Sequence, residues 1–282
     1  MPFAMPFAMR LLRAAAPAWP SHRGWFRLAR LARDRVPAGH RQGVFTTAMN
    51  TRLRLDLNDY PDFSMAPGVY ERSTVRLVQK LLKPGMHLVD CGANLGYFTT
   101  LAAKIVGPTG RIDAFEPDPI NRQRLIENVA LNDASQIVRV HECAVGDRAD
   151  VLRMSRAQGD FANHGESSLA SSNNTETFEV RLCRADAVIE RKPDLVKIDV
   201  EGFEALALSG MSEWFADGPS PRLIIECNRG TLERAGSSPT KLLELIRTLR
   251  PGAVVYEIDW PMRKVNDATN IDSQDRNWFV EK

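Results

Sequence analysis

The segment LVDCGANLGYF (Leu88–Phe98) decides the expected fold. Its apolar first half is typical of a buried strand, Gly92 and Gly96 indicate a tight turn, and the residues from Leu95 onward predict a helix. The two glycines let the backbone pass close to a ligand and let the helix pack against the strand. Asn94 stands between them, and asparagine tolerates a left-handed backbone. The resulting pattern, D-x-G-x-N-x-G, differs from the G-x-G-x-x-G of dinucleotide-binding turns.

An acidic residue follows this turn at an informative distance. Glu116 lies 26 residues after Asp90 and closes the next predicted strand, Arg111–Phe115. A carboxylate at that place can accept hydrogen bonds from both hydroxyls of a ribose. Two nucleoside ligands compete, because NAD would bring a pyrophosphate to the helix start whereas S-adenosylmethionine would bring an amino-acid end. Asp90 would repel the pyrophosphate and attract the ammonium group, which favours S-adenosylmethionine. A strand and turn without any ligand is the remaining alternative.

Strand and helix patterns alternate beyond this segment, as expected of a parallel sheet. The expected helices span Val75–Leu82, Leu95–Ile105, Asn121–Leu131 and Pro239–Leu249. The expected strands begin at Met86 and continue with Arg111–Phe115, Ile137–Cys143, Asp194–Val200 and Arg222–Cys227, and a terminal hairpin joins Ala253–Ile258 to Asn277–Val280. Two further strands, Val151–Met154 and Phe178–Leu182, flank a polar segment and predict an inserted hairpin. The loop of that hairpin, with Gly165–Leu169 at its centre, is expected to cover a substrate.

Length and composition suit a single catalytic domain with an extension. The chain has 282 residues and 44% apolar residues, enough for one α/β domain over residues 51–282. The four cysteines have no metal-ligand spacing and are expected to be reduced. No apolar run approaches the roughly 20 residues that span a bilayer. Because Arg10 and Arg13 interrupt the short apolar start, an export signal is disfavoured and a cytoplasmic location is expected.

Residues 1–50 are expected to form a basic extension that is partly disordered. They contain eight arginines, no lysine and one acid, which gives about +7 there, whereas the whole chain carries only +2. The global charge therefore does not point to a nucleic acid partner. The repeated MPFA at the start is expected to be disordered. Thr51–Leu57 alternates polar and apolar residues and predicts a strand paired with Gly43–Ala48.

Within that extension, residues 21–36 predict one amphipathic helix. Its apolar face is expected to contain Trp25, Leu28, Ala29, Ala32 and Val36. The favoured role of the helix is to dock on the catalytic domain. The alternative is a peripheral contact of this arginine-rich helix with a membrane surface.

Acidic residues gather where two neighbouring strands are predicted to end. Asp199 and Glu201 follow the strand from Asp194, and Glu226 ends the next one. Ligands of open α/β sheets bind beyond the carboxyl ends of the strands. Lys197 shares a face with Asp199 and is expected to pair with it. Alternatively, Asp199 caps the helix that follows.

Four segments in order, VDCGANLGYF, AFEP, KIDVEGFE and IIEC, resemble the FkbM family of S-adenosylmethionine-dependent methyltransferases over residues 71–228. The resemblance implies an α/β, Rossmann-like class I methyltransferase fold: a seven-stranded, mostly parallel sheet with a reversed final strand and helices on both faces. It also implies O-methylation of sugar or natural-product hydroxyls. By position, it places the methionine end, the ribose and the adenine against Asp90, Gly92, Ala93, Asn94, Gly96, Phe98, Glu116, Pro117, Ala144 and Asp147.

Methyl transfer to a hydroxyl requires alignment of the acceptor and removal of a proton. Asp199 is the candidate base, and Glu201 and Glu226 are expected to line the acceptor side. The second-ranked alternative is that these three carboxylates hold a divalent cation. No N-P-P-Y or Pro-Cys segment indicates methylation of a nucleobase. The expected acceptor is therefore a small hydroxyl compound such as a sugar, glycolipid or natural product; a macromolecule such as RNA or protein, or a non-catalytic S-adenosylmethionine-binding scaffold, is the alternative.

Overall fold

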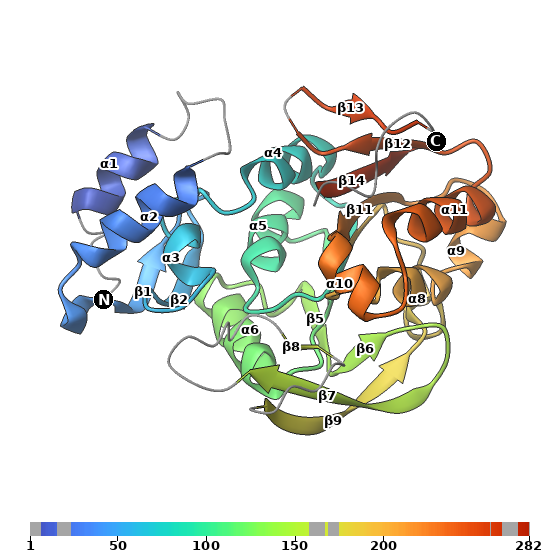
Figure 1. Cartoon of the computed structure of the whole chain (residues 1–282), viewed down its shortest axis with the longest axis horizontal. Helices are drawn as coiled ribbons and strands as arrows, with labels where there is room; N and C mark the ends of the chain where they lie inside the picture. Colours follow the sequence, from blue (N-terminus) through green and yellow to red (C-terminus); the bar gives the residue numbers. More distant parts are fainter. Residues whose placement is uncertain are drawn as a thin grey trace.

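The central sheet of the computed structural model has eight strands in the order β13-β12-β14-β11-β10-β3-β4-β5 (Figure 1). The structure describes residues 7–15, 24–157, 167–168, 175–259, 261–266 and 276–281. Neighbouring strands from β11 to β5 run parallel, and β14 is antiparallel to both β11 and β12. The strands of this sheet span His87–Cys91 (β3), Arg111–Phe115 (β4), Val138–His141 (β5), Leu195–Ile198 (β10), Arg222–Cys227 (β11), Val254–Glu257 (β12), Arg263–Lys264 (β13) and Arg276–Glu281 (β14).

This topology confirms the predicted Rossmann-like α/β class with a reversed final strand. Seven strands were expected; the eighth, β13, contains two residues and pairs with the end of β12. The predicted terminal hairpin is also confirmed, because β12 and β14 pair antiparallel, although β13 lies between them in the sequence.

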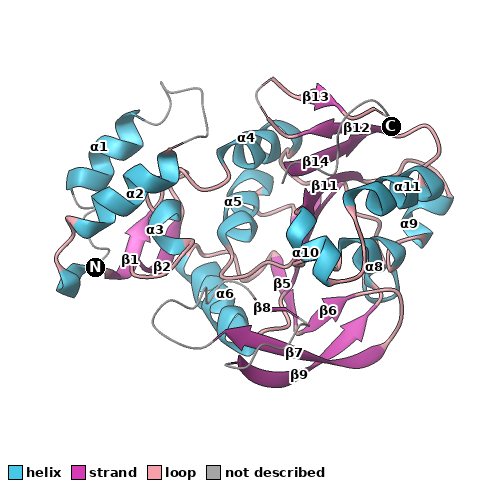
Figure 2. Ribbon diagram, viewed as in Figure 1, coloured by secondary structure: helices cyan, strands magenta, loops and turns pink. Residues whose placement is uncertain are grey.

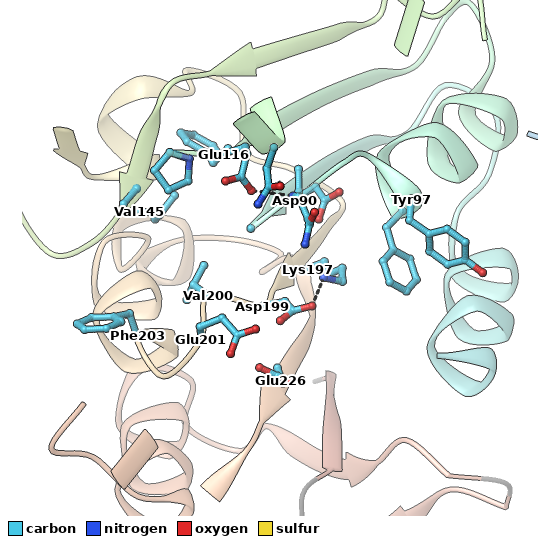
Figure 3. A pocket seen from close by; sticks show the side chains of 18 of the residues that line it. Asp90, Tyr97, Glu116, Val145, Lys197, Asp199, Val200, Glu201, Phe203 and Glu226 are labelled. Atoms are coloured by element: carbon cyan, nitrogen blue, oxygen red, sulfur yellow. Dashed lines mark hydrogen bonds and ion pairs between the residues drawn. The ribbon is translucent and has the colours of Figure 1, made fainter. Parts of the chain in front are cut away.

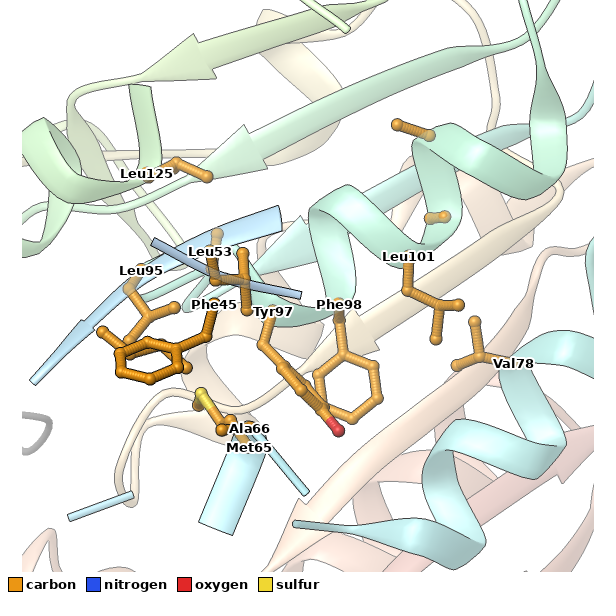
Figure 4. Close-up of a cluster of buried hydrophobic side chains, with 14 of the residues drawn as sticks. Phe45, Leu53, Met65, Ala66, Val78, Leu95, Tyr97, Phe98, Leu101 and Leu125 are labelled. Carbon is orange, nitrogen blue, oxygen red and sulfur yellow. The ribbon is translucent and has the colours of Figure 1, made fainter. Parts of the chain in front are cut away.

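Helices cover both faces of the sheet, because successive side chains of a strand point to opposite sides (Figure 2). Leu88 on β3 packs into a hydrophobic cluster with α4, α5 and α6, whereas Val89 packs into a second cluster with α8, α9 and α11. Figure 4 shows the first cluster, where Leu101 of α5 faces Val78 of α4. The helices of the catalytic region span Arg72–Leu81 (α4), Tyr97–Val106 (α5), Pro119–Leu131 (α6), Ala185–Val188 (α7), Glu204–Ser209 (α8), Glu213–Ala216 (α9), Arg229–Arg234 (α10) and Pro239–Leu249 (α11).

The predicted helices are present, but two of them begin at other residues than predicted because of a glycine or a capping side chain at the start. The helix expected from Leu95 begins at Tyr97, because Gly96 adopts a left-handed conformation with φ of 92°. α6 begins at Pro119, two residues early, because the side chain of Asp118 caps its first backbone N–H groups. α11 has the predicted bounds.

A second sheet of four strands lies beside the first, in the order β6-β9-β7-β8. The single strand predicted over residues 137–143 is wrong, because β5 ends at His141 and β6 begins at Cys143. Between them Glu142 stays exposed and pairs with two arginines, and β6 then finds a parallel partner in β9 instead of continuing in the main sheet. The strands of the second sheet span Cys143–Val145 (β6), Asp150–Ala157 (β7), Ser167–Ser168 (β8) and Thr175–Cys183 (β9).

The predicted inserted hairpin is confirmed, because β7 and β9 pair antiparallel. It belongs to the second sheet and not to the main one. Of the predicted covering loop, only Ser167–Ser168 is described, as β8 paired with β7. Gly165, Glu166 and Leu169 lie outside the described residues.

The N-terminal extension contains two helices, α1 (Phe7–Ala15) and α2 (Trp25–Asp34), where one was predicted. The expected disordered repeat over residues 1–8 therefore ends inside α1; its first six residues lie outside the described part of the chain. Met9 and Leu12 are buried on α1, which packs against α2. Burial of these two apolar side chains explains the additional helix.

The predicted apolar face of α2 is correct except at one position. Its other members are buried, but Leu28 is 48% exposed, because the buried stripe is narrower than the spacing suggested. Phe26 packs on Phe63 of α3 (Asp62–Met65), with ring centroids 5.2 Å apart. α2 thus docks on the rest of the chain, as favoured from the sequence.

The predicted hairpin follows these helices, as β1 (Gln42–Thr46) and β2 (Arg52–Asp56). The side chain of Asn128 on α6 accepts the N–H of Arg54 at 2.7 Å and ties the hairpin to the catalytic region. The boundary proposed after residue 50 lies within the turn of this hairpin. Across all described helices, none is both long enough and apolar enough to cross a bilayer.

Candidate functional site

The turn after β3 has the backbone that its residues predicted. Gly92, Asn94 and Gly96 all have positive φ, at 78°, 51° and 92°. A Cβ atom on Gly92 would lie 1.8 Å from the carbonyl oxygen of Asp199. Glycine is therefore required because two loops meet, as well as for the turn itself.

Glu116 fixes this turn from the end of β4. Its Oε2 accepts the N–H of Asn94 at 2.7 Å, and its Oε1 accepts the N–H of Asp118 at 2.9 Å. The side chain is buried, and burial raises the pKa of Glu116 to about 8 against the effect of these hydrogen bonds. Each carboxylate oxygen retains a second lone pair for a ligand hydroxyl.

Asp90 is fully buried at the end of β3. Its Oδ2 accepts the hydroxyl of Thr99 at 2.6 Å, while its Oδ1 is enclosed and has no hydrogen-bond partner among the described residues. Burial raises the pKa of Asp90, and Lys197 acts in the opposite direction. An unsatisfied buried carboxylate oxygen suits a ligand that brings hydrogen-bond donors, such as an ammonium group.

These residues open into one cavity of about 230 Å³. Its lining contains most of the predicted ligand-binding residues: Asp90, Gly92, Ala93, Asn94, Phe98, Glu116, Pro117 and Ala144. Gly96 is not in the lining, because its α-carbon faces Leu125. Asp147 is also outside it, where its carboxylate pairs with Arg148.

One side of the cavity is apolar and comes largely from the second sheet. Val145 of β6, Leu152 and Met154 of β7, and Leu182 of β9 all contribute to it. Such a surface suits the flat face of a purine base. The resemblance implied that residues 144–147, and so Val145, lie beside adenine. Leu152, Met154 and Leu182 were not predicted, because the pairing of β9 with β6 and β7 joins positions distant in the chain.

The opposite side of the cavity is acidic. Asp199, Glu201 and Glu226 all line it, and Figure 3 shows their carboxylates facing one another. Asp199 and Glu226 meet because β10 and β11 are parallel neighbours. Glu201 lies in the turn after β10 with a left-handed φ of 53°, which is rare for a residue with a side chain.

The predicted pair of Lys197 and Asp199 is confirmed, with Nζ 2.7 Å from Oδ2. Asp199 does not cap the following helix α8, whose N-cap residue is Phe203 and which has no side-chain cap. Glu204 accepts the N–H groups of Val200 and Gly202 in the turn before that helix. The alternative assignment of Asp199 as a helix cap is therefore excluded.

Lys197 is the functional candidate that the predicted site residues omitted. Its ammonium is buried and lies 4.8 Å from the ring centroid of Phe98. Burial lowers the pKa of Lys197, but the carboxylates of Asp199, Asp90 and Glu71 outweigh this effect and hold that pKa above its usual range. The sequence signal for Lys197 was its position two residues before Asp199, which places both side chains on the same face of the strand.

Glu71 extends the acidic side into an adjoining cavity. It precedes α4 with a left-handed φ of 40°, and its Oε2 accepts the side-chain N–H of Asn277 at 2.8 Å. Burial, followed by Asp199, raises the pKa of Glu71. Tyr70 and Glu226 line both this adjoining cavity and the main cavity of about 230 Å³. The open space at the acidic edge therefore continues into this second cavity.

Comparison with known proteins gives the family. The model described as "Methyltransferase FkbM domain" matches residues 90–251, more than half of the chain. A 117-residue stretch is 36% identical to methyltransferase sdnD of Sordaria araneosa and covers 40% of this chain and 43% of that protein. The match thus spans less than half of the length of that relative.

Solved structures with a similar fold include methyltransferase FkbM from Methylobacillus flagellatus KT. That structure has a TM-score of 0.44 and 19% identity, with coverage of 81% of this chain and 56% of the other. An rRNA methylase from Streptococcus thermophilus has a TM-score of 0.41 and 9% identity, with coverage of 73% and 91%. The family match includes the turn after β3 and both acidic strand ends, and the resemblance noted from the sequence is confirmed: the chain belongs to the FkbM methyltransferase family.

Proposed function

We propose that this FkbM-family methyltransferase uses S-adenosylmethionine to methylate a hydroxyl group of a small polar compound in the cytoplasm. Sugars, glycolipids and other natural products are the acceptor class. The observation that carries the proposal is the composition of the cavity, which has a volume of about 230 Å³. Residues suited to a nucleoside line one side of it, and acidic residues line the opposite side. A ligand-binding protein without chemistry has no need for that acidic edge.

The residues present fit S-adenosylmethionine. The unsatisfied Oδ1 of Asp90 suits the ammonium group, Glu116 suits the ribose hydroxyls, and the apolar side of the second sheet suits adenine. When bound, the cofactor supplies a methyl carbon activated by a sulfonium.

On the acceptor side, Asp199 accepts a hydrogen bond from the hydroxyl, aligns its oxygen and takes its proton. Lys197 holds the carboxylate of Asp199 in place through the contact at 2.7 Å. Glu201 and Glu226 bind further hydroxyls of the acceptor from the same side. An acceptor with several neighbouring hydroxyls therefore fits this edge better than an isolated alcohol.

The test combines binding with transfer. Calorimetry of the full chain should detect binding of S-adenosylhomocysteine and none of NADH; tight NADH binding without S-adenosylhomocysteine binding would overturn the cofactor assignment. Labelled S-adenosylmethionine is then offered with sugars, glycolipids, total RNA and protein. Label in a hydroxyl compound supports the proposal. Label in RNA or protein alone supports a macromolecular acceptor instead, and binding without transfer supports a scaffold.

We further propose that α1 and α2 contact an anionic membrane surface. Exposed apolar side chains on these two helices alternate with exposed arginines, a combination that suits the boundary between headgroups and acyl chains. The apolar members are Phe7 (71% exposed), Leu11 (56%), Leu28 (48%) and Leu31 (51%). Tyr60 lines the cavity and its ring centroid lies 5.2 Å from that of Phe26 on α2, so such a contact would bring the cavity close to lipid-linked acceptors.

A further inference from the structure

The acidic edge of the site has the arrangement of a cation-binding site. One carboxylate oxygen each from Asp199, Glu201 and Glu226 lies within 4.8 Å of the other two. Three atoms so placed lie no further than about 2.8 Å from a common centre, close to the 2.3–2.6 Å of calcium–oxygen contacts. In Figure 3 the three side chains converge from the turn after β10, which carries Asp199 and Glu201, and from β11, which carries Glu226.

A second observation points to a missing partner at the same place. Oε2 of Glu226 is enclosed by the protein and has no hydrogen-bond partner within the described ranges. A buried carboxylate oxygen without a partner is costly, because it has lost its hydration. Positive charge bound beside Glu226 would remove that penalty.

Within the described part of the chain, the ammonium of Lys197 pairs with Asp199 at 2.7 Å and does not bond to Oε2 of Glu226. A cation at the acidic edge would supply the positive charge that this oxygen lacks. The left-handed backbone of Glu201, followed by Gly202 with φ of 102°, holds the turn in place next to Glu226.

We infer that Asp199, Glu201 and Glu226 bind one hard divalent cation, of the class of Mg²⁺, Ca²⁺ or Mn²⁺. Oxygen ligands suit these ions, and three protein ligands leave coordination positions for water and for the acceptor. The inference deepens the proposed function and rests on it for its chemical consequence: a hydroxyl bound to the cation loses its proton more readily. With the ion bound, the three carboxylates would reach the acceptor hydroxyls through it, and Asp199 would still receive the proton that the hydroxyl releases.

The direct test is a titration of the full chain with Mn²⁺, followed by the electron paramagnetic resonance signal of free Mn²⁺. We expect one bound ion per chain, displaced by excess Ca²⁺ or Mg²⁺. Glu226→Gln should weaken Mn²⁺ binding at least tenfold. Glu201→Gln should also weaken Mn²⁺ binding at least tenfold. Because Glu201 lies in a turn outside the sheet, this variant keeps the test possible if Glu226→Gln fails to fold. Glu244→Gln, exposed on α11, is the matched control and should bind like wild type.

Two results would overturn the inference: no Mn²⁺ bound by the wild-type chain, or unchanged binding in both glutamine variants. S-adenosylhomocysteine binding, measured by calorimetry on chain treated with EDTA, separates this failure from failure of the proposed function. Intact S-adenosylhomocysteine binding with no Mn²⁺ binding rejects the cation site alone. Absence of S-adenosylhomocysteine binding rejects the proposed function. The Mn²⁺ titration still decides separately whether the cation site exists.

Discussion

At the scale of the residue, the side chain of Asp199 decides the proposed chemistry. Asp199→Asn keeps the size of the side chain and an oxygen near Lys197 but removes the negative charge. We expect kcat to fall by roughly 10²–10⁴-fold, the contribution typical of a positioned base. Binding of S-adenosylhomocysteine, measured by calorimetry, should stay close to wild type. A variant with wild-type kcat would refute the role of Asp199.

Glu116 gives a prediction about pH. Its pKa is raised to about 8 in the folded chain, chiefly by burial, from an ordinary value of 4.5. The folded chain therefore binds this proton more tightly than the unfolded chain, so the contribution favours folding below about pH 4.5 and is lost as the pH rises to 8. Glu116→Gln should reduce the loss of unfolding free energy over that interval by about 1.4 kcal/mol per pH unit.

Urea unfolding at intervals of one pH unit measures this slope. Glu213→Gln, exposed on α9, is the control and should keep the wild-type slope. Equal slopes for wild type and Glu116→Gln would contradict the effect of burial on Glu116.

Sequence alone predicted site residues that lie within or directly after a strand. Asp90, Glu116 and Asp199 follow this rule, because a strand pattern fixes where its carboxyl end falls. Glu71 does not follow this rule, because it precedes the helix α4. Its place beside the site depends on tertiary contacts such as its hydrogen bond with Asn277. Single-sequence patterns carry no information on such distant contacts.

At the scale of the element, the turn after β3 and the turn after β10 are in direct contact. A Cβ on Gly92 would lie 1.8 Å from the backbone oxygen of Asp199, whereas a Cβ on Gly107 would meet nothing within 4 Å. Both glycines have positive φ, 78° and 66°. Gly107→Ala should therefore cost roughly 1–3 kcal/mol of unfolding free energy, from backbone conformation alone.

Gly92→Ala should cost clearly more and should also weaken S-adenosylhomocysteine binding, because the clash with the backbone of Asp199 displaces the turn after β3, which lines the cofactor side of the cavity. Urea unfolding and calorimetry on the two variants separate the backbone effect from the clash. Equal stability of the two variants, with wild-type affinity in both, would show that the turns are not coupled.

The second sheet marks where prediction of elements from the sequence fails. Residues 137–143 mix apolar and polar side chains and contain no glycine or proline, so no turn signal separates β5 from β6. The division depends on which partner each half finds: β5 pairs with β4, and β6 pairs with β9, whose residues lie about forty positions away. Pairing is a property of the folded chain and overrides the local pattern.

At the scale of the whole molecule, charge is unevenly distributed. Residues 1–50 carry about +7 and the rest about −5, although the total is +2. We expect the full chain to sediment with vesicles of phosphatidylglycerol and phosphatidylcholine, not with phosphatidylcholine alone, and to be released by salt. The double variant Leu28→Ala/Leu31→Ala should bind at least about fivefold more weakly, through loss of roughly 1 kcal/mol of apolar burial.

The matched control for that experiment is the double variant Ile120→Ala/Ile126→Ala. These two side chains are 54% and 46% exposed on α6, away from the arginine-rich helices. The control should bind vesicles like wild type. Equal weakening in both variants would indicate a non-specific apolar effect and would reject α1 and α2 as the contact surface.

The second sheet departs from the main sheet at Glu142 and its chain returns through α7 to β10. The ladder that joins β10, β3 and β4 contains none of its residues. A lineage can consequently rewrite this unit by insertion or recombination while the framework that aligns the reacting groups is inherited unchanged. Because the unit supplies the apolar side proposed for adenine, an engineer who exchanges it between relatives should alter the grip on the cofactor and leave the acidic edge intact.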